Sequence, residues 1–484
     1  MKHANLFLGL IPVILLWMLT AVTAVSQRPA VMHEDPANAM LPEALSLLSN
    51  YLAIPSESGT ELDAGSFLMD VCKDRGFHVV RFDSDTTGMN FVASLYPLGQ
   101  GKPNIIFHNH IDVVHPGDEA DWKHPPYSGT VSGQKVWGRG SIDNKGLAVI
   151  QVMAAASFIS LAESEELPYN VSILSVSGEE TGGQRGSSIV AEKYLDMLHP
   201  AVIIGEGSCG FKNMELLGID GPVFGISIAD KSMLWLEIRV RGEEFGHAST
   251  HAGSYPNKKL VEGLSRILDM PQKVRFNDAS LLMFKHIGNI RGGFRGFAIR
   301  NLDHFPFRSV LKKYVKDEPR LEALACNTIT LTHLHNPEGC VNQHSSEAHA
   351  YLDCRLLPGV RSEEMISDIR KVLDDDAFRI RVVTEGPPAL ITEPDGFYHV
   401  MAASINDVFP DAGVIPVLFP ATTDNNYFRE KGFPVYGINP FYMSMDQISS
   451  IHNTDEYMDI EDLRVGIEVF RVFIGKMMEE GLAY

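Results

Sequence analysis

The sequence predicts an α/β fold in which a layered domain carries a smaller inserted domain. Between residues 76 and 207, short apolar runs bounded by turn residues alternate with stretches of helical periodicity, which is typical of strands interleaved with helices. After Ala229 the apolar runs become amphipathic, as in SMLWLEIRVRG. From about Asp395 the layered pattern returns. We therefore expect the layered domain to be discontinuous, with an α+β domain inserted into it.

The elements of the layered domain follow from its apolar runs. A helical pattern at residues 41–52 comes first, and a second helix is expected in KGLAVIQVMAAASFISLA. The strands before the insertion are expected in GFHVVRF, NFVASLY, NIIFHNHIDVV, NVSILSVS and AVIIGEG. After it come HVMAASINDVF, VIPVLFP, FPVYGINP and a final helix over residues 460–479. This order predicts a mixed sheet between two helical layers.

The inserted domain is expected to hold a β-α-β-β-α-β unit, the order of ferredoxin-like folds. Its strands and helices are predicted in SMLWLEIRVRG, residues 257–268, NTITLTHLH, EAHAYLDCRLL, SEEMISDIRKVLDD and FRIRVVTEG. Such a unit forms a small sheet with helices on one face. The segment 271–325 has helical and irregular character and takes no place in this order. We predict domain limits of 40–229 with 389–484 for the layered domain, and 230–388 for the insertion.

The first residues form an export segment or an anchor. Residues 4–25 carry no charge, and the run LFLGLIPVILLWML follows a single Lys2. A basic start, an apolar core and the small residues around Ala24 are typical of a cleaved signal peptide, but the stretch is nearly the roughly 20 residues that cross a bilayer. We expect residues 1–26 to be a signal peptide or a membrane anchor, with a linker over 27–39. The remaining chain would then be exported, periplasmic or secreted, or would face outside the cytoplasm from a membrane.

Composition limits the partners. The 41 Lys and Arg against 61 Asp and Glu give a net charge of −20, which argues against nucleic acid, since neutralising phosphates requires a clustered basic excess. Five cysteines are too few and too scattered for a disulfide scaffold.

Acidic and histidine side chains gather at the ends of predicted strands, where open α/β sheets place their ligands. Each of these motifs, taken alone, could also be purely structural; the Glu179–Glu180 pair, for example, could lie in a solvated loop. Together they supply imidazole and carboxylate ligands for a pair of zinc ions bridged by one carboxylate. The cluster contains His110, Asp112, Asp143, Glu179, Glu180, Glu206 and His452.

These motifs resemble those of the dizinc metallopeptidases that include carboxypeptidase S, aminoacylase and the glutamate carboxypeptidases. The resemblance runs from about Leu41 to Met478, is most specific in HIDVV, DWKHPPYSG, VWGRGSIDNKG and SGEETGG, and is nearest to the carboxypeptidase S branch. It implies two Zn²⁺ per subunit and a bridging role for Asp143, with Glu179 as general base and Asp112 orienting a ligand. The ligands it implies are His110, Asp143, Glu180, Glu206 and His452.

The resemblance extends to the insertion, which it makes a lid and dimerisation domain. GEEFGHAST implies that His247 reaches the active site of a partner subunit in a homodimer, where it would stabilise an oxyanion. Asn342 and Arg355 resemble lid residues that hold a substrate carboxylate, although a local structural hydrogen bond is the alternative for both. In ATTDNNYFREKGFP, Asp424 is retained and Asn426 stands where an arginine is usual. Gly205 precedes Glu206 where near relatives have Asp.

The resemblance implies hydrolysis of an amide bond beside a C-terminal amino acid with a free carboxylate, as in a carboxypeptidase or dipeptidase acting on short peptides. The alternative is an N-acyl-amino-acid amidohydrolase, for which SLLMFKHIGNIRGGFRGF would line an acyl pocket or simply pack in the core. A metal-binding protein without catalysis is disfavoured, because Glu179 and every ligand are present. A serine hydrolase is disfavoured because no G-x-S-x-G elbow occurs.

Overall fold

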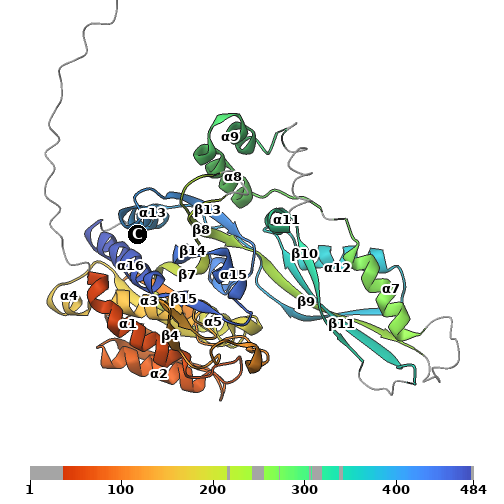
Figure 1. The fold of residues 1–484 in the computed structure, drawn as a ribbon, viewed down its shortest axis with the longest axis horizontal. Coiled ribbons are helices and arrows are strands. Elements are labelled where there is room, and N and C mark those ends of the chain that lie inside the picture. The colour runs from red at the N-terminus through yellow and green to blue at the C-terminus, as the bar shows by residue number, and fades with distance from the viewer. Residues whose placement is uncertain are drawn as a thin grey trace, which may run out of the picture. The chain divides into compact units, whose positions relative to one another are not determined.

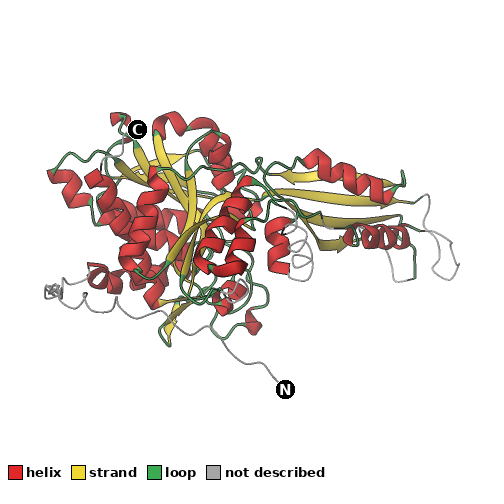
Figure 2. Ribbon diagram, turned by 90° about the horizontal axis from the view of Figure 1, so that it is seen from above, coloured by secondary structure: helices red, strands yellow, loops and turns green. Residues whose placement is uncertain are grey.

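The computed structural model describes residues 36–214, 219–242, 255–271, 273–304, 307, 319–336 and 342–480. The predicted export segment and His247 lie outside these residues. Two main sheets hold most of the described strands (Figures 1 and 2). In sheet order the larger contains β1 (His78–Phe82), β2 (Asn90–Ser94), β6 (Asn170–Val176), β3 (Asn104–His110), β7 (Pro200–Phe211), β14 (Val435–Tyr442), β8 (Val223–Asp230) and β13 (Gly413–Phe419).

This sheet is mixed. The consecutive strands β6, β3, β7 and β14 are parallel to one another, and β8 is parallel to β13. β1 is antiparallel to β2, β2 to β6, and β14 to β8. The four central parallel strands therefore bring their carboxyl ends to one edge, where loops can meet.

Helices cover both faces of the large sheet because its central strands are apolar on both sides. Phe107 of β3 packs with one core and its neighbour Ile106 with another, as the alternation of side chains along a strand requires. The first face is covered by α1 (Pro36–Leu52), α2 (Leu62–Asp74), α3 (Lys145–Ala156), α13 (Gly396–Val408) and α16 (Ile460–Glu480). The second is covered by α5 (Ser187–Lys193), α6 (Leu195–Leu198) and α14 (Asn425–Glu430).

One helical stretch among the described residues, Lys145–Ser164, is long and apolar enough to cross a membrane. It comprises α3 and the short α4 (Ile159–Ser164). α3 packs against α1 and α16, and its side chains from Lys145 to Ala155 are buried. We therefore assign this stretch to the core.

The smaller sheet has the strand order β10 (Thr328–His335), β11 (Glu347–Leu356), β9 (Ser232–Arg241), β12 (Phe378–Glu385), and all its pairs are antiparallel. α7 (Pro256–Leu268) and α12 (Ser362–Leu373) pack on one face. Alternate residues of β11 are buried there. The order β9-α7-β10-β11-α12-β12 with this pairing is ferredoxin-like. The predicted fold class, a layered α/β domain with an inserted α+β unit, is confirmed.

The segment 271–325, for which the sequence predicted no position in the fold, contains α8 (Asp278–Arg291), α9 (Gly293–Arg300) and α11 (Pro319–Ala325). Met283, Phe284 and Ile287 of α8 pack with Ile415 and Val417 of β13. Figure 1 shows α8 beside β13, away from α7 and α12. Part of the chain between α7 and β10 thus returns to cover an edge strand of the large sheet.

A third sheet is small but joins distant parts of the chain. It contains β15 (Tyr457–Asp459), β5 (Lys135–Trp137) and β4 (Thr130–Ser132), in that order. Tyr457 pairs with Trp137 across the antiparallel β15 and β5. The turn after β5 and the loop before β15 consequently run close together.

Candidate metal centre

Asp143 lies between two histidines that are far apart in the sequence. Its Oδ1 is 3.0 Å from Nε2 of His110, the last residue of β3. Its Oδ2 is 3.2 Å from Nε2 of His452, which follows α15 (Met445–Ser450). Each imidazole therefore faces a different oxygen of one carboxylate, as expected for a carboxylate that bridges two cations.

Two groups of possible ligands share Asp143. His110, Asp143 and Glu206 have donor atoms within 4.8 Å of one another, and the same holds for Asp143, Glu180 and His452. Within them, Glu206 Oε2 is 3.5 Å from His110 Nε2, and Glu180 Oε2 is 3.2 Å from His452 Nε2. Buried Oε1 of Glu180 has no hydrogen-bond partner among the described residues. Imidazole and carboxylate donors in two groups with a shared member fit a pair of divalent cations.

The crowded carboxylates shift one another's protonation. Burial and the charge of Glu206 raise the pKa of Glu179 well above its usual range, and burial and the charge of Asp143 raise the pKa of Glu180 to about 7. Hydrogen bonds to Asp143 and Glu180 raise the pKa of His452 to about 10. So much negative charge in a buried site favours cations that would offset it.

The strand ends explain most of this arrangement. His110 ends β3, and Glu179 and Glu180 form a single 3₁₀ turn directly after β6, so parallel neighbours deliver both to one edge. Glu206 differs from the expectation that it follows its strand, because it lies inside β7. The pairing of β7 with β14 shifts register between Gly205 and Ser208, and this irregularity lets Glu206 face the cluster.

Gly205 has a local reason to lack a side chain. A Cβ there would lie 2.1 Å from Oδ1 of Asn425. Asn425 occupies that space and donates from Nδ2 to the carbonyl oxygen of Glu206 at 2.9 Å. The aspartate usual in near relatives could not be placed here without displacing Asn425.

Asp112 contacts both the histidine and the acidic turn. Nδ1 of His110 is 2.9 Å from the backbone oxygen of Asp112 and 3.5 Å from its carboxylate Oδ1. The carboxylate itself accepts hydrogen bonds from the backbone N–H groups of Gly178 (2.8 Å), Glu179 (3.1 Å) and Glu180 (3.1 Å), and from the hydroxyl of Ser58 at 2.7 Å. Asp112 therefore fixes the turn that carries the two glutamates.

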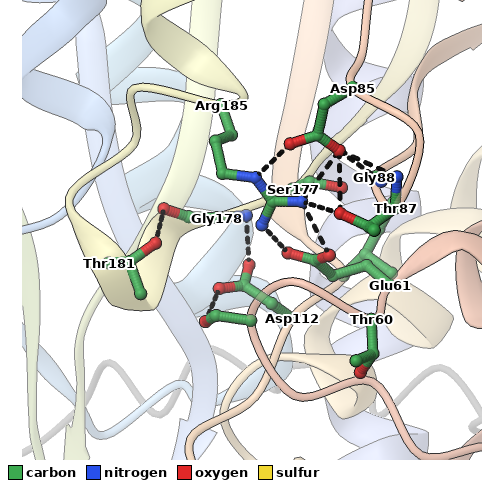
Figure 3. Close-up of polar contacts among 12 residues, drawn as sticks. Thr60, Glu61, Asp85, Thr87, Gly88, Asp112, Ser177, Gly178, Thr181 and Arg185 are labelled. Carbon is green, nitrogen blue, oxygen red and sulfur yellow. Dashed lines mark hydrogen bonds and ion pairs between the residues drawn. The ribbon is translucent and has the colours of Figure 1, made fainter.

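Arg185 anchors the segment that follows this turn (Figure 3). The guanidinium donates to both oxygens of buried Glu61 and both oxygens of Asp85. It also donates to the hydroxyl of Thr87 at 2.7 Å. Arg185 thereby connects the segment after the acidic turn to the start of α2 and to the loop between β1 and β2.

Of the residues predicted to bind substrate, one lines the cavity and another does not. Arg355 lines the cavity that contains the cluster, and its Nε and Nη2 donate to Asp353 at 3.1 and 2.8 Å. Asn342 is exposed in the loop before β11 and is not among the lining residues. His247 lies outside the described residues, so its predicted role stays a prediction.

The residues around α14 that resemble the family motif have different surroundings in the structure. Asp424 lines the cavity, and burial with nearby carboxylates raises its pKa to about 7. Asn426 is buried and points elsewhere, because its Nδ2 donates to the carbonyl oxygen of Lys231 at 3.0 Å. One helical turn later, Arg429 forms a buried ion pair with Asp230 at 2.5 Å and donates to Asn426 Oδ1. The amide at 426 thus holds the junction of β8 and β9.

Three residues that support the acidic cluster were not predicted from the sequence. Asn144 donates from Nδ2 to Glu206 Oε2 at 2.5 Å, and its place beside Asp143 was the available signal. Arg185 and Glu456 act through partners far along the chain, and no spacing in the sequence announces them.

The cluster lies in a cavity of about 1640 Å³. Asp143, Glu179, Glu180, Glu206 and His452 line it together with walls that are mostly apolar. Among the apolar lining residues are Met283, Leu324, Phe409, Ile415, Val417 and Val465. A cluster of possible metal ligands with a large apolar space beside it suits a ligand that has both a polar and an apolar part.

Comparisons with known proteins agree with this geometry. A family model described as peptidase family M20/M25/M40 matches residues 106–476. The probable carboxypeptidase S-like 2 of Dictyostelium discoideum is 25% identical over 381 residues, which are 77% of this chain and 71% of that protein. The N-fatty-acyl-amino acid synthase/hydrolase PM20D1 of Mus musculus is 25% identical over 382 residues, 75% of this chain and 72% of that protein. Among solved structures, the M20 family metallo-carboxypeptidase Sso-CP2 from Sulfolobus solfataricus superposes with a TM-score of 0.68 at 19% identity, covering 89% of this chain and 98% of that one.

Proposed function

The chain belongs to peptidase family M20/M25/M40, and on that premise we propose that it is a dizinc hydrolase that cleaves the amide bond beside a C-terminal amino acid with a free carboxylate. Its substrates would be short peptides, as for a carboxypeptidase or dipeptidase. The observation that carries the proposal is the pair of ligand groups that share Asp143, with Glu179 beside them in one cavity.

The residues divide the chemistry among them. His110, Asp143 and Glu206 would hold one Zn²⁺, and Asp143, Glu180 and His452 the other. When bound, the two ions would polarise the amide carbonyl and lower the pKa of a water molecule.

Glu179 is the proton carrier in this proposal. Its carboxylate lies within 4.8 Å of the donor atoms of His110 and Glu180, so it adjoins both proposed metal positions without being needed to complete either group that shares Asp143. It would take a proton from the attacking water and return it to the nitrogen of the leaving amine.

Arg355 would hold the free carboxylate of the substrate. Its guanidinium lines the cavity, and the pair with Asp353 engages Nε and Nη2, which leaves Nη1 outside that pair. Guanidinium groups suit planar carboxylates. Because Asn342 is exposed away from the cavity lining, its assistance would require a movement of the inserted domain or a second subunit. The proposed oxyanion donor His247 and the homodimer are supported by the motif around residue 247.

A second candidate is an N-acyl-amino-acid amidohydrolase. The cavity has a volume of about 1640 Å³ and mostly apolar walls, which favours this candidate. Ligand pockets usually have volumes of about 300–1,000 Å³, so a dipeptide would fill only part of this cavity. The PM20D1 relative, named for N-fatty-acyl amino acids, supports the same reading. Of the run 280–297, Met283 lines the cavity, while Phe294 and Phe297 are exposed.

A product assay separates the two candidates. Purified protein loaded with Zn²⁺ is incubated with a panel of dipeptides and N-acyl amino acids, and products are identified by mass spectrometry. Release of a free C-terminal amino acid from dipeptides supports the first candidate, and preferential release from long N-acyl substrates supports the second. Absence of amide cleavage across the panel, with two zinc ions bound, would contradict both.

We also propose that residues 1–26 export or anchor the protein, so that it works outside the cytoplasm. The uncharged stretch of residues 4–25 supports this. Amino-terminal sequencing of the protein recovered from membrane and soluble fractions tests it: a mature chain that begins near residue 27 indicates cleavage, and an intact chain in the membrane indicates an anchor. An intact chain confined to the soluble cytoplasmic fraction would contradict the proposal.

A further inference from the structure

Glu456 is a buried carboxylate that carries no part in the chemistry described above. Its side chain has an exposed fraction of 0%. Oε2 accepts hydrogen bonds from Arg139 Nη1 at 2.7 Å and from the backbone N–H of Gly140 at 2.9 Å. Oε1 accepts from the backbone N–H groups of Ile142 at 2.8 Å and Asp143 at 3.1 Å. One carboxylate therefore holds the whole turn that presents Asp143.

The same residue belongs to the segment that presents His452. Its backbone oxygen accepts from the N–H of Gly138 at 3.0 Å, and Tyr457 next to it begins β15, which pairs with β5. Arg139 adds a second connection, because its Nη2 donates to the backbone oxygen of Asn453 at 2.9 Å. The segments 138–143 and 452–457 are thus tied together at both backbone and side-chain level.

We propose that Glu456 is a positioning residue that fixes Asp143 and His452 relative to each other, so that the two metal positions keep their spacing. The inference rests on the proposed function in one respect, the assignment of Asp143 and His452 as ligands. Groups that orient metal ligands commonly determine affinity although they never touch the ion. A buried carboxylate with four donors, all within five residues of Asp143, has the geometry for that task.

The alternative is that Glu456 only stabilises the fold, since removing one partner of a buried ion pair is destabilising wherever the pair lies. Glu456→Gln separates the two. The glutamine is nearly isosteric, but one of its two oxygens becomes an NH₂ group that faces N–H donors. A matched control is Asn170→Ala. Asn170 is also buried, exchanges two hydrogen bonds with the backbone of Tyr96 at 3.0 Å, and begins β6, at the end opposite the acidic turn.

The experiment measures zinc content by mass spectrometry, zinc affinity by chelator competition, the thermal midpoint of the metal-free proteins, and kcat and KM. We expect Glu456→Gln to weaken zinc affinity by about 10- to 100-fold and to lower kcat more than KM changes. Asn170→Ala should lower the midpoint and keep the wild-type zinc affinity. If Glu456→Gln does not fold, Glu456→Asp, which keeps the charge but retracts the carboxylate by one methylene, must weaken zinc binding in the same way.

Two other outcomes would overturn the inference. Zinc affinity in Glu456→Gln equal to that of the wild type would show that Glu456 does not position the ligands. If Asn170→Ala weakened zinc binding as much as Glu456→Gln does, the loss of zinc affinity would be an effect of general destabilisation. Failure of the wild type to bind two zinc ions would instead contradict the proposed function, so the two failures are distinguishable.

Discussion

The carboxylate of Asp112 accepts a hydrogen bond from the backbone N–H of Glu180 at 3.1 Å. Asp112 follows β3 and Glu180 follows β6, and these two strands are parallel neighbours in the large sheet. The residue predicted to orient His110 therefore also fixes a proposed ligand of the other ion. Two metal positions that share such supports should respond together to mutation.

Asp112→Ala should weaken zinc binding by about 10- to 100-fold, because ligand-orienting contacts typically contribute that much. Three backbone donors of the acidic turn lose their acceptor at once. Chelator competition measures the affinity. Ser58→Ala, which removes one donor to Asp112 Oδ2, serves as the milder control. Equal effects of the two variants would contradict a dominant role for the carboxylate.

Glu179→Ala should lower kcat by about 10²- to 10⁴-fold, the usual contribution of a general acid and base. The groups that share Asp143 remain complete without it, so two zinc equivalents should stay bound. Turnover and metal content are measured on the same preparation. Glu163, which is exposed on α4, provides a control in Glu163→Ala. Full activity in Glu179→Ala would contradict the mechanism.

Arg185→Leu should reduce the free energy of unfolding by about 3–5 kcal/mol, the usual result of leaving a buried charge unpaired. The charge in question is that of Glu61, which is fully buried. Urea unfolding measures the change. The double variant Arg185→Leu with Glu61→Leu should regain part of the loss, because no carboxylate is then left alone; a double variant less stable than the single one would count against the explanation.

Zinc should stabilise the protein more at about pH 8 than at about pH 6. In the metal-free state, Glu180 has a pKa of about 7 and His452 of about 10, both above their unfolded values of 4.5 and 6.5. Their contribution to stability is present below the unfolded pKa and is lost as the pH rises through the folded pKa. Zinc replaces these protons. Thermal midpoints with and without zinc at both pH values test this, and a gap that narrows toward pH 8 would refute it.

Leu324→Trp should lower kcat/KM for long N-acyl amino acids more than for dipeptides. Leu324 is partly buried and lines the cavity with Ile415 and Val417, so an indole there shortens the apolar space. Steady-state kinetics on acyl chains of increasing length measure the effect. Dipeptide turnover is the internal control for folding. An unchanged length preference would place the acyl group elsewhere.

The sequence by itself determined the fold class and the membership of the acidic cluster. Periodicity indicates which residues are buried, and it placed His110 and Glu180 at the ends of predicted strands, where open α/β sheets gather ligands. The parallel pairing of β3 and β6, which brings the two ends together, came from the structure. The order β9-α7-β10-β11-α12-β12 was readable from alternating apolar positions.

Only the tertiary structure decided which residue faces which partner. Motifs predicted substrate roles for both Asn342 and Arg355, but Arg355 alone of the two lines the cavity. The apolar face of α8 was visible in the sequence, whereas its packing on β13 was not. Glu456 contacts a turn more than 300 residues earlier in the chain, with Asp143 separated from it by 313 positions. Periodicity records that a side chain is buried but carries no information about the neighbour that buries it, and long-range contacts of this kind depend on how the sheets assemble.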